Sequence, residues 1–408
     1  MLPFEDARRK VIEDVGALVR TPRQETIALD DALGRVLAET VVADRDYPPF
    51  DRSTRDGYAV RAADLHGGTN TLALIGEIRA GQDFAAAVRP GECVQIMTGA
   101  AAPASTDAVV MIEQTHAETD EGRTRIRFDR SPEPGQNIVR RGTEAHTGQK
   151  LLAPGKRLGY AELALAGQVG RAKLAVTARP RVAILSTGDE VVAVDATPGP
   201  LEIRNGNSVS LAAQVRLAGG EPVLLGNVAD RAEELRRAIE RGLEADALVI
   251  SGGVSAGKYD LVEGVLAGLG AQFHFDGVAI RPGRPAVFGV CRGKPVFGLP
   301  GNPVSTMVTF ELFLLPALDI LSGTAPRPLP VLRAKLGAAV RQKSALTHFL
   351  PAKIEWTSGE PVVRELKWQG SGDIVALAEA NCFLVVPRAK LEWEAGEWVG
   401  VLPRRGAL

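Results

Sequence analysis

The spacing of hydrophobic residues divides the chain into regions that predict different secondary structures. Phe4, Ala7, Val11 and Val15 recur at helical spacing, which predicts an amphipathic helix over residues 3–20. Similar patterns predict helices over Leu29–Leu37 and over Ala161–Ala166. Between these helical patterns, short apolar runs interrupted by Gly and Pro predict a β-rich insert, with strands at Thr71–Ile75, Glu92–Met97, Ala108–Ile112 and Thr124–Phe128.

From Arg181 onward, apolar strands alternate with helical patterns. The predicted strands are Val182–Leu185, Val223–Leu225, Ala247–Ile250, Val287–Val290 and Val296–Leu299. The predicted helices are Ser208–Ala218, Ala232–Leu243, Asp260–Leu269 and Val304–Ile320. This alternation is typical of βαβ units, so we expect a parallel sheet with helices on both faces.

A proline-rich segment, residues 324–330, separates this region from a last stretch of short alternating strands. Those strands, Lys353–Trp356, Val362–Lys367 and Phe383–Pro387, predict a small β-barrel or sandwich. The expected fold is therefore a multidomain α/β plus β protein with a central α/β domain. Its expected domains are a helical linker region (1–46 and 147–178), a β-rich insert (47–146), the α/β domain (179–326) and a C-terminal β-barrel (327–408). We expect hinges near residues 147–155 and 326–330.

Composition narrows the classes of function. The chain has 48 Lys and Arg against 49 Asp and Glu, and only 5% of its residues are aromatic, which argues against a nucleic-acid-binding protein. Three widely spaced cysteines form no CxxC pair, as expected in a reducing compartment. The first residues lack the pattern of a signal peptide, and the apolar run Phe310–Leu321 is interrupted by Glu311, Pro316 and Asp319. We therefore expect a cytoplasmic protein that does not associate with membranes.

Two predicted strands end in loops suited to a charged ligand. Ligands of open parallel sheets bind where the strands end at their carboxyl termini. The first loop is Ser186-Thr187-Gly188-Asp189-Glu190, whose hydroxyls and Gly amide suit an anion and whose carboxylates suit a divalent cation. An ordinary turn with solvated carboxylates fits the same residues.

The second loop runs from Ser251-Gly252-Gly253 through Ser255 to Lys258 and Asp260. Adjacent glycines let backbone amides face a phosphate, and Asp260 is placed to cap the next helix or to bind a metal ion. Its partial match to a Walker A loop lacks the Ser or Thr that binds magnesium, since Tyr259 follows Lys258. We therefore favour an anion-binding loop of another kind.

Two further turns extend this set of charged loops. Arg281-Pro282-Gly283-Arg284-Pro285 displays two guanidinium groups from a stiff turn, although a solvated basic turn has the same composition. Pro300-Gly301-Asn302-Pro303 places Asn302 at a helix N-cap and Pro303 at the first helical position, so that helix amides would face a phosphate. Cationic and anionic side chains in one crevice suit a phosphorylated ligand carrying Mg²⁺.

Polar turns also occur in the other regions. The segment Asp51-Arg52-Ser53-Thr54-Arg55-Asp56-Gly57 and the hydroxyl of Thr98 beside Gly99 lie in the insert. Arg140-Arg141-Gly142-Thr143-Glu144 is a third polar loop there. In the last region Ser371 precedes a short helix, where helix capping and ligand contact both remain open.

In their order along the chain, these segments resemble the molybdopterin molybdenumtransferases, the MoeA family that includes the E domain of gephyrin. The resemblance covers essentially the whole chain. It rests on segments 50–53, 56–59, 97–100, 137–142, 186–190, 251–255, 281–285, 299–305 and 370–372.

The resemblance implies that molybdenum from molybdate enters adenylylated molybdopterin, with AMP released and Mg²⁺ assisting. It implies a homodimer in which one protomer's insert covers the other's crevice. It also implies transient contact with a molybdopterin adenylyltransferase and with molybdoenzyme maturation proteins. No covalent protein nucleophile is needed.

The implied site combines both regions. The implied catalytic residues are Asp56, Thr98, Glu190 and Asp260, with Thr98 bonding an oxyanion. The implied metal ligands are Glu190, Asp230 and Asp260. The implied substrate-binding residues are Ser186, Thr187, Gly188, Asp189, Gly252, Gly253, Ser255, Lys258, Arg281, Arg284, Pro300, Gly301, Asn302, Pro303 and Ser371.

The sequence departs from some relatives at Glu144, Gly277 and Arg281, where they carry Asp, a basic residue and Lys. Arg keeps the charge of Lys but not its geometry. Two other functions are compatible with the same α/β domain. A nucleotide-cleaving hydrolase would act without molybdate, and a non-catalytic molybdopterin carrier or scaffold would cleave nothing.

Overall fold

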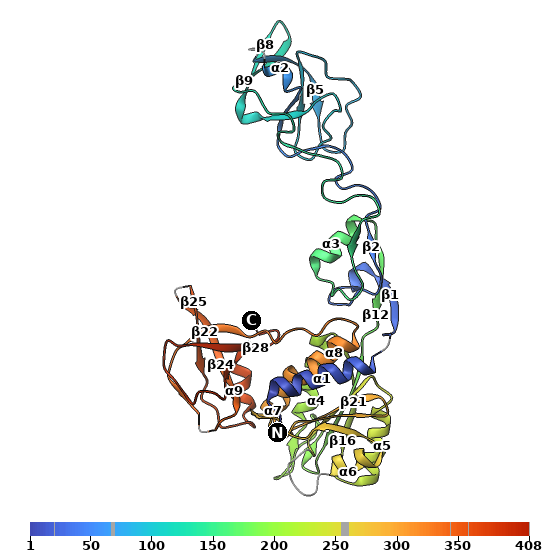
Figure 1. The fold of residues 1–408 in the computed structure, drawn as a ribbon, viewed down its shortest axis with the longest axis vertical. Coiled ribbons are helices and arrows are strands. Elements are labelled where there is room, and N and C mark those ends of the chain that lie inside the picture. The colour runs from blue at the N-terminus through green and yellow to red at the C-terminus, as the bar shows by residue number, and fades with distance from the viewer. Residues whose placement is uncertain (20, 67–69, 254–260, 343, 358, 408) are drawn as a thin grey trace. The chain divides into compact units, whose positions relative to one another are not determined.

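The computed structural model describes residues 1–19, 21–66, 70–253, 261–342, 344–357 and 359–407. The chain divides into two compact units, each held together by contacts among its own residues (Figure 1). The α/β–barrel unit comprises residues 1–38, 155–159 and 174–408, and the insert unit comprises residues 39–154 and 160–173.

The central sheet of the α/β–barrel unit has the strand order β16-β13-β17-β21-β20-β18. Its neighbouring strands β16, β13, β17 and β21 are parallel, as the strand–helix alternation predicts. The strands span β13 Arg181–Thr187, β16 Glu221–Val228, β17 Ala247–Ser251, β18 Gln272–Phe275, β20 Val287–Cys291 and β21 Lys294–Leu299. The sequence pattern missed β18, whose four residues are too few to show a period.

One strand departs from the expected direction, so the sheet is mixed. Strand β20 runs antiparallel to β21, with Cys291 opposite Lys294. Only Arg292 and Gly293 join the two strands, and both have positive φ, at 50° and 74°. Such a two-residue turn closes a hairpin, because a parallel connection needs a crossover of a dozen or more residues.

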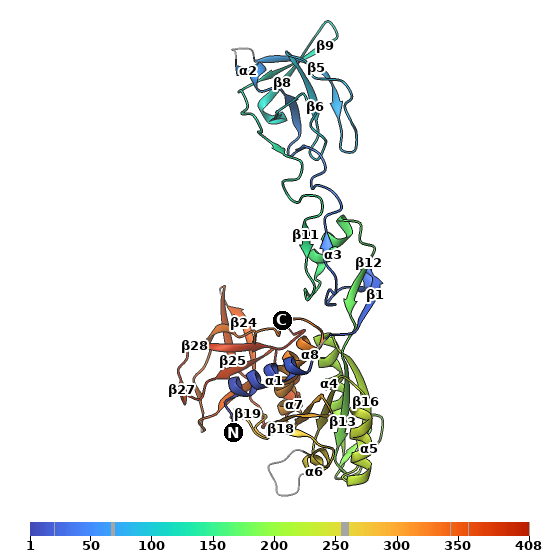
Figure 2. The same cartoon turned by 45° about the vertical axis from the view of Figure 1, so that its right-hand side comes forward.

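Helices cover both faces of this sheet (Figures 1 and 2). Val182 and Ile184 face a core shared with α4, α7 and α8, whereas Ala183 and Leu185 face a core shared with α5 and α6. This two-residue alternation is what a strand buried on both faces produces. The helices are α4 Gly206–Ala218, α5 Ala232–Gly242, α6 Leu261–Gly268, α7 Pro303–Thr309 and α8 Leu315–Leu321.

Helices α7 and α8 are joined by a π-helical turn, Phe310–Leu314, into one helix over residues 303–321. This segment is longer than the apolar run that the sequence suggested, and by length and composition it could cross a membrane. In the structure, however, 83% of its most apolar window is buried in the protein core. A core helix of this kind passes the same length and hydropathy test.

The C-terminal region forms a closed five-stranded barrel, as expected, in the order β24-β25-β22-β28-β26 with β26 pairing back to β24. Its strands are β22 Leu332–Leu336, β24 Thr347–Thr357, β25 Glu360–Glu365, β26 Cys382–Val386 and β28 Trp398–Pro403. The short strand β19 (Ile280–Arg281) of the α/β region pairs with β24. The ring of Phe4 meets that of Phe349 edge-on at 5.6 Å, so barrel and α/β region share one core.

The proline-rich segment that we expected to be a hinge is held in place. The fully buried carboxylate of Asp319 accepts hydrogen bonds from the backbone amide of Arg327, at 2.9 Å, and from its guanidinium, at 2.6 Å. Arg157 also donates to Asp319, at 3.1 Å. A buried carboxylate needs such partners, so the ion pairs fix residue 327 against α8.

The N-terminal region is only partly helical. Helix α1 (Phe4–Leu18) packs its buried Ala7, Val11 and Val15 into the core beside α8. The helix expected at Leu29–Leu37 is wrong, because only the 3₁₀ turn Leu29–Asp31 forms. Gly34 has φ 74°, which ends any helix, and Leu37 pairs with Val176 instead.

The insert unit contains the expected β-rich region as a sheet in the order β7-β4-β6-β5-β9-β8. Its strands are β4 Gly57–Val60, β5 Thr71–Ile78, β6 Glu92–Ile96, β7 Ala108–Met111, β8 Thr115–Asp120 and β9 Arg123–Phe128. Short pairs, β3 Arg52–Ser53 with β10 Ile138–Val139 and β2 Val41–Val42 with β11 Lys150–Leu152, connect to helix α3 (Tyr160–Gln168).

Candidate active site

The register of the parallel strands brings three of the predicted loops to one edge of the sheet. Ser186 of β13 lies opposite Ser251 of β17, and Ser251 lies opposite Leu299 of β21. Each residue is the last or nearly the last of its strand. The loops that follow therefore leave the sheet side by side, as the binding rule for open α/β sheets requires.

The first two loops pack closely through glycine. Gly252 and Gly253 have φ values of 93° and 64°. A Cβ at Gly252 would lie 2.5 Å from the Thr187 carbonyl oxygen, and one at Gly253 would lie 2.7 Å from Thr187 Oγ1. Glycine is needed at both positions because the backbone conformation and the space each exclude a side chain. Thr187 Oγ1 is buried and has no hydrogen-bond partner among the described residues.

The third strand-end loop joins this pair. The Gly252 amide donates to the Leu299 carbonyl at 3.1 Å, and a Cβ at Gly301 would lie 3.7 Å from Gly252 Cα. Asn302 has the N-cap position of α7 and Pro303 is the first helical residue, as predicted. The Asn302 side chain makes no capping hydrogen bond, however.

Instead, the barrel loop containing Ser371 docks on this helix start. Asn302 Nδ2 donates to Ser371 Oγ at 2.9 Å, and the Val304 amide donates to the Ser371 carbonyl at 3.0 Å. The Val304 amide, which we expected to face a phosphate, is therefore occupied by the barrel. Asp373 rather than Ser371 caps the short helix α9 (Ile374–Glu379), because its carboxylate accepts from the Ala376 amide.

The basic turn meets the same helix. A Cβ at Gly283 would lie 2.6 Å from the Thr309 methyl group, so the turn packs against α7 without a gap. Pro282 and Gly283 are buried, whereas the side chains of Arg281 and Arg284 are exposed. Neither guanidinium forms an ion pair with the described residues, although Arg284 Nε donates to Met1 Sδ at 3.1 Å. Both charges are thus available to a ligand.

Carboxylates gather at the adjoining loops. Asp189 Oδ1 accepts a hydrogen bond from the Asp230 amide at 3.2 Å, which joins the loops after β13 and β16. The Glu190 carboxylate folds over Gly188, 2.6 Å from where a Cβ would stand. In the part of the chain that the structure describes, no group of three potential ligands forms a metal site. Ser255, Lys258 and Asp260 lie outside the described residues, so the predicted trio of Glu190, Asp230 and Asp260 stays a prediction.

In the insert unit, the structure brings Asp56 and Thr98 together. Asp56 Oδ1 accepts hydrogen bonds from the Thr98 amide at 2.6 Å and from its hydroxyl at 2.7 Å. These two bonds lower the pKa of Asp56 below its ordinary value. Because the Thr98 hydroxyl gives its hydrogen to Asp56, the role we expected for it, donating to an oxyanion, would require that bond to break.

Three asparagines that the sequence analysis passed over hold the crevice loops together. Asn205 caps α4 and accepts from the Ser186 hydroxyl at 3.2 Å. Asn207 Nδ2 reaches both Ser251 and Gly301, and Asn227 Nδ2 donates to the Gly188 carbonyl at 3.1 Å. The sequence feature that could have identified them is their position. Asn205 and Asn207 come just before the predicted helix start at Ser208, and Asn227 lies close to the end of β16.

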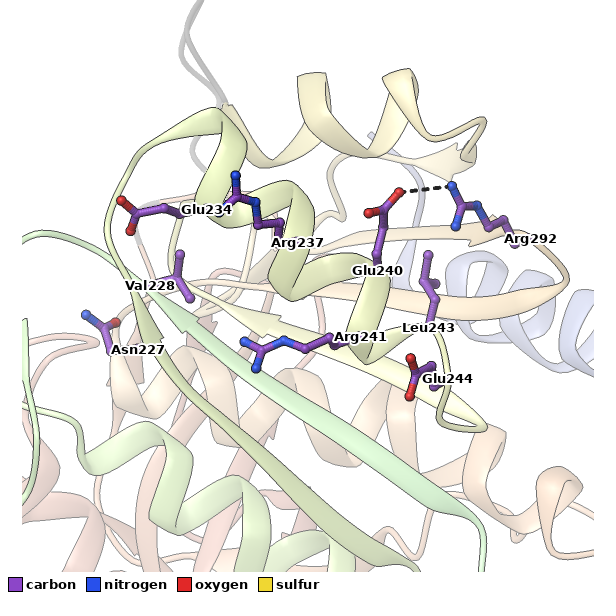
Figure 3. Close-up of a pocket in the computed structure, with 9 residues that line it drawn as sticks. All are labelled: Asn227, Val228, Glu234, Arg237, Glu240, Arg241, Leu243, Glu244 and Arg292. Atoms are coloured by element: carbon purple, nitrogen blue, oxygen red, sulfur yellow. Dashed lines mark hydrogen bonds and ion pairs between the residues drawn. The ribbon is translucent and has the colours of Figure 1, made fainter.

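A separate surface hollow of about 990 Å³ lies beside α5 (Figure 3). Its lining mixes both charges, since it contains three arginines and three glutamates, two of each on α5, and Arg292 of the β20–β21 turn pairs with Glu240 at 3.2 Å. Residues of both signs leave little net charge to attract a phosphate. The loops at the sheet edge therefore remain the better candidate site.

The cysteines do not contribute a nucleophile to this site. Cys93, Cys291 and Cys382 are buried and unpaired. Burial raises the pKa of Cys93 and that of Cys382 to about 12, and it raises the pKa of Cys291. A thiol needs a lowered pKa to react at neutral pH, so these three are structural.

Taken together, the fold and the site define an open α/β domain with a ligand-binding edge, in a chain that also contains an insert and a barrel. Residues 183–320 match the family described as a probable molybdopterin binding domain. Residues 2–170 match the MoeA N-terminal region (domain I and II), and residues 333–403 match the MoeA C-terminal region (domain IV).

Whole-chain similarity agrees with these matches. The molybdopterin molybdenumtransferase of Bacillus subtilis is 33% identical over 98% of this chain and 94% of its own, and that of a Nostoc species is 34% identical over 93% and 88%. A crystal structure of a molybdopterin biosynthesis MoeA protein from Pyrococcus horikoshii covers all of both chains with a TM-score of 0.77 and 33% identity. The chain belongs to the molybdopterin molybdenumtransferase, or MoeA, family.

Proposed function

We propose that this protein inserts molybdenum from molybdate into adenylylated molybdopterin, releasing AMP and forming the molybdenum cofactor. The observation that carries the proposal is the packing of three strand-end loops, a basic turn and a barrel loop around one edge of a molybdopterin-binding domain. The relatives that match nearly the full chain are named for this transfer.

The crevice residues suit a phosphorylated substrate. Thr187 and Ser251 supply hydroxyl donors, whereas the Gly252 amide is already bonded to the Leu299 carbonyl. Arg281 and Arg284 supply positive charge that is not committed to protein carboxylates in the described chain. Donors and charges arranged in advance stabilise phosphate oxygens without reorganisation when the reaction occurs. We assign Lys258 and Ser255 to the same task.

The acids of the adjoining loops fit a hard divalent cation, because Mg²⁺ prefers carboxylate oxygens. Glu190 and Asp230 stand on neighbouring loops, and Asp260 completes the proposed set. A bound Mg²⁺ would polarise the phosphoanhydride as a Lewis acid. We expect Asp260→Asn to fold normally and to lose turnover.

The proposed reaction balances without an added oxidant, reductant or protein nucleophile. One oxygen passes from molybdate to phosphorus, the P–O bond of the anhydride breaks, and AMP leaves. The two dithiolene sulfurs replace that oxygen on molybdenum and give up two protons, which offset the charge formed on the separated phosphates. Asp56, held as a carboxylate by Thr98, is proposed to handle molybdate.

An AMP-release assay tests the proposal and separates it from the alternatives. Purified protein is incubated with adenylylated molybdopterin and Mg²⁺, with and without molybdate, and AMP is measured by chromatography. Release that requires molybdate supports the transferase. Release without molybdate indicates a nucleotide-cleaving hydrolase, and no release indicates a carrier. Glu190→Gln is the matched inactive control.

We further propose that the protein acts as a homodimer in which one protomer's insert serves the other's crevice. Helix α4 supports this, because its face away from the core exposes Val209 and Leu217, each more than half accessible. A helix that is apolar on both faces is usually buried on both. Mixing Asp56→Asn with Glu190→Gln protein would restore activity in heterodimers, since one of the two sites then has both wild-type residues. Without such restoration, each site lies within one protomer.

The proposed setting is the cytoplasm, where three unpaired cysteines stay reduced. The proposed partners are a molybdopterin adenylyltransferase that supplies the substrate and maturation proteins that receive the product.

A further inference from the structure

The side chain of Asn207 lies between two of the crevice loops. Asn207 is the second residue of helix α4, and its side-chain amide nitrogen donates to Ser251 Oγ at 2.9 Å and to the Gly301 carbonyl at 2.7 Å. A carbonyl oxygen can only accept, so the Gly301 contact fixes which end of the Asn207 amide faces the loops. Both hydrogens of that amide are thereby used, and neither is left for a ligand.

This arrangement determines where the Ser251 hydroxyl hydrogen can go. Ser251 Oγ accepts from Asn207, so its own hydrogen must point away from Asn207. Among the described residues, the bond from Asn207 is the one hydrogen bond that the Ser251 hydroxyl makes. Ser251 is 3% exposed, and a buried donor without an acceptor is costly.

The hydroxyl of Thr187, on the neighbouring strand end, also lacks an acceptor among the described residues. Thr187 is also 3% exposed, and its Oγ1 has no partner among the described residues. It stands at the end of β13, beside β17, against Gly252 and Gly253. Two buried hydroxyls on neighbouring strand ends, beside a glycine pair, form a set of donors with no acceptor in the described protein. A bound phosphate supplies that acceptor.

The geometry points to Asn207 as a positioning residue that turns the Ser251 hydroxyl hydrogen toward a phosphate group of the substrate. This inference rests on the proposed function and names a part of its binding step. Asn207 acts through Ser251, and Ser251 touches the ligand. Holding Gly301 with the same amide keeps the third loop at a fixed distance from that hydroxyl.

A double-mutant cycle tests this role. Asn207→Leu keeps the side-chain shape but removes both donors, and Ser251→Ala removes the hydroxyl. Binding of molybdopterin is measured by fluorescence titration, with inorganic pyrophosphate as a competitor. We expect each single variant to weaken molybdopterin binding by about tenfold to a hundredfold, the range for one hydrogen bond to a charged group. Asn207→Leu should weaken binding by a smaller factor in the Ser251→Ala protein than in the wild-type protein, and the factor that remains measures the contact with Gly301.

Controls separate this inference from the function on which it rests. Ser210→Ala is matched, because Ser210 Oγ bonds the Asn207 carbonyl on the same helix turn and reaches no loop, and it should bind normally. If the wild-type protein fails to bind molybdopterin, the proposed function is wrong. A different outcome is that the wild-type protein binds molybdopterin while Asn207→Leu weakens binding by the same factor in the wild-type and Ser251→Ala proteins. In that case the positioning role is wrong.

The pyrophosphate arm identifies the group that is recognised. Its inhibition constant should rise in Asn207→Leu by the same factor as the molybdopterin dissociation constant. An unchanged inhibition constant would place the effect on the pterin and overturn the assignment to phosphate. If thermal unfolding shows that Asn207→Leu does not fold, Asn207→Ala enters the same cycle with the same expected outcomes.

Discussion

The crevice of the α/β–barrel unit and the Asp56–Thr98 pair of the insert unit are built in opposite ways. The crevice is made of turns whose glycines touch other backbone, so that Gly252 lies against Thr187 and Gly301 lies against Gly252. The Asp56–Thr98 pair is exposed and held by two hydrogen bonds, and the adjacent Gly99 has open space around it.

This difference in packing indicates which substitutions and changes of hydrogen-bond partner each region can tolerate. Close-packed turns fix donor positions but leave no room for added atoms. An exposed carboxylate with two donors can change its partners at little cost, which suits a group that meets its ligand only when another surface approaches. The following tests examine that contrast.

The largest effect should come from a methyl group at Gly252. Gly252 and Gly99 have similar φ values, 93° and 86°, so the backbone strain of an alanine is comparable at the two sites. At Gly252, however, the new Cβ would also lie 2.5 Å from a backbone carbonyl. We expect Gly252→Ala to cost about 3 kcal/mol or more, and Gly99→Ala about 1 kcal/mol.

Calorimetric unfolding of both variants measures this difference, and molybdopterin binding should fall about a hundredfold in Gly252→Ala because the loop moves. Equal shifts in Tm for the two variants would show that close packing does not distinguish the crevice.

A second test uses the pH dependence of the exposed pair. Two Thr98 donors hold the pKa of Asp56 below its ordinary value. Thr98→Val removes one donor, so the pKa of Asp56 should rise toward that value and the acid limb of activity should move to higher pH. NMR titration of the Asp56 carboxyl group measures the change directly.

Because the two hydrogen bonds lower the pKa of Asp56, its carboxylate is protonated only as the pH falls through that lowered pKa. A variant with a higher Asp56 pKa therefore loses the carboxylate at a higher pH. Thr98→Ser keeps the hydroxyl and should leave the titration where it is in the wild-type protein. A Thr98→Val protein in which the pKa of Asp56 is unchanged from the wild-type protein would contradict the assigned cause.

A smaller effect is expected where the barrel meets the crevice. Ser371→Ala removes the hydroxyl that accepts from Asn302, but the backbone bond from Val304 to the Ser371 carbonyl remains. We expect a loss of about 1 kcal/mol or less in stability and a few-fold loss in binding. Ser371→Thr is the control that retains the acceptor, and a much larger loss in Ser371→Ala would indicate direct contact with the ligand.

The smallest effect should come from thiol reagents. Because burial raises the pKa of Cys93 and Cys382 to about 12, and raises that of Cys291, all three thiols should resist iodoacetamide at pH 8 in the native protein. Mass spectrometry of native and urea-unfolded samples measures this. Rapid native labelling with loss of activity would reopen the question of a cysteine nucleophile.

Hydrophobic patterns were sufficient to locate the parallel strands and the helices of the α/β region. Helix α5 coincides closely with its predicted span because its buried residues recur at helical spacing, and strand β17 does so because it is one continuous apolar run. The pattern could not give the direction of β20, which depends on a two-residue turn with positive φ. Nor could it show that Leu37 would pair with Val176 rather than continue a helix, because that choice depends on a distant strand.

The candidate site shows the same division. Glycines, prolines and hydroxyls at strand ends identified Thr187, Gly252 and Asn302 from local sequence alone. The positions of Asn207 and Asn227 beside predicted elements were visible in the sequence, but their roles depend on contacts to loops far away in the sequence, which local patterns do not show.

By itself, the sequence determined the alternating strands and helices of the α/β region and which turns require glycine, because periodicity and backbone sterics act between near neighbours. It also determined the family, through short segments spread over the whole chain. Only the tertiary structure decided that the barrel's Ser371 occupies an amide of α7, that Asp319 fixes the expected linker, and that Asn207 links two loops. Each of these contacts joins residues brought together by the burial of a common core, and such contacts leave no period in the sequence.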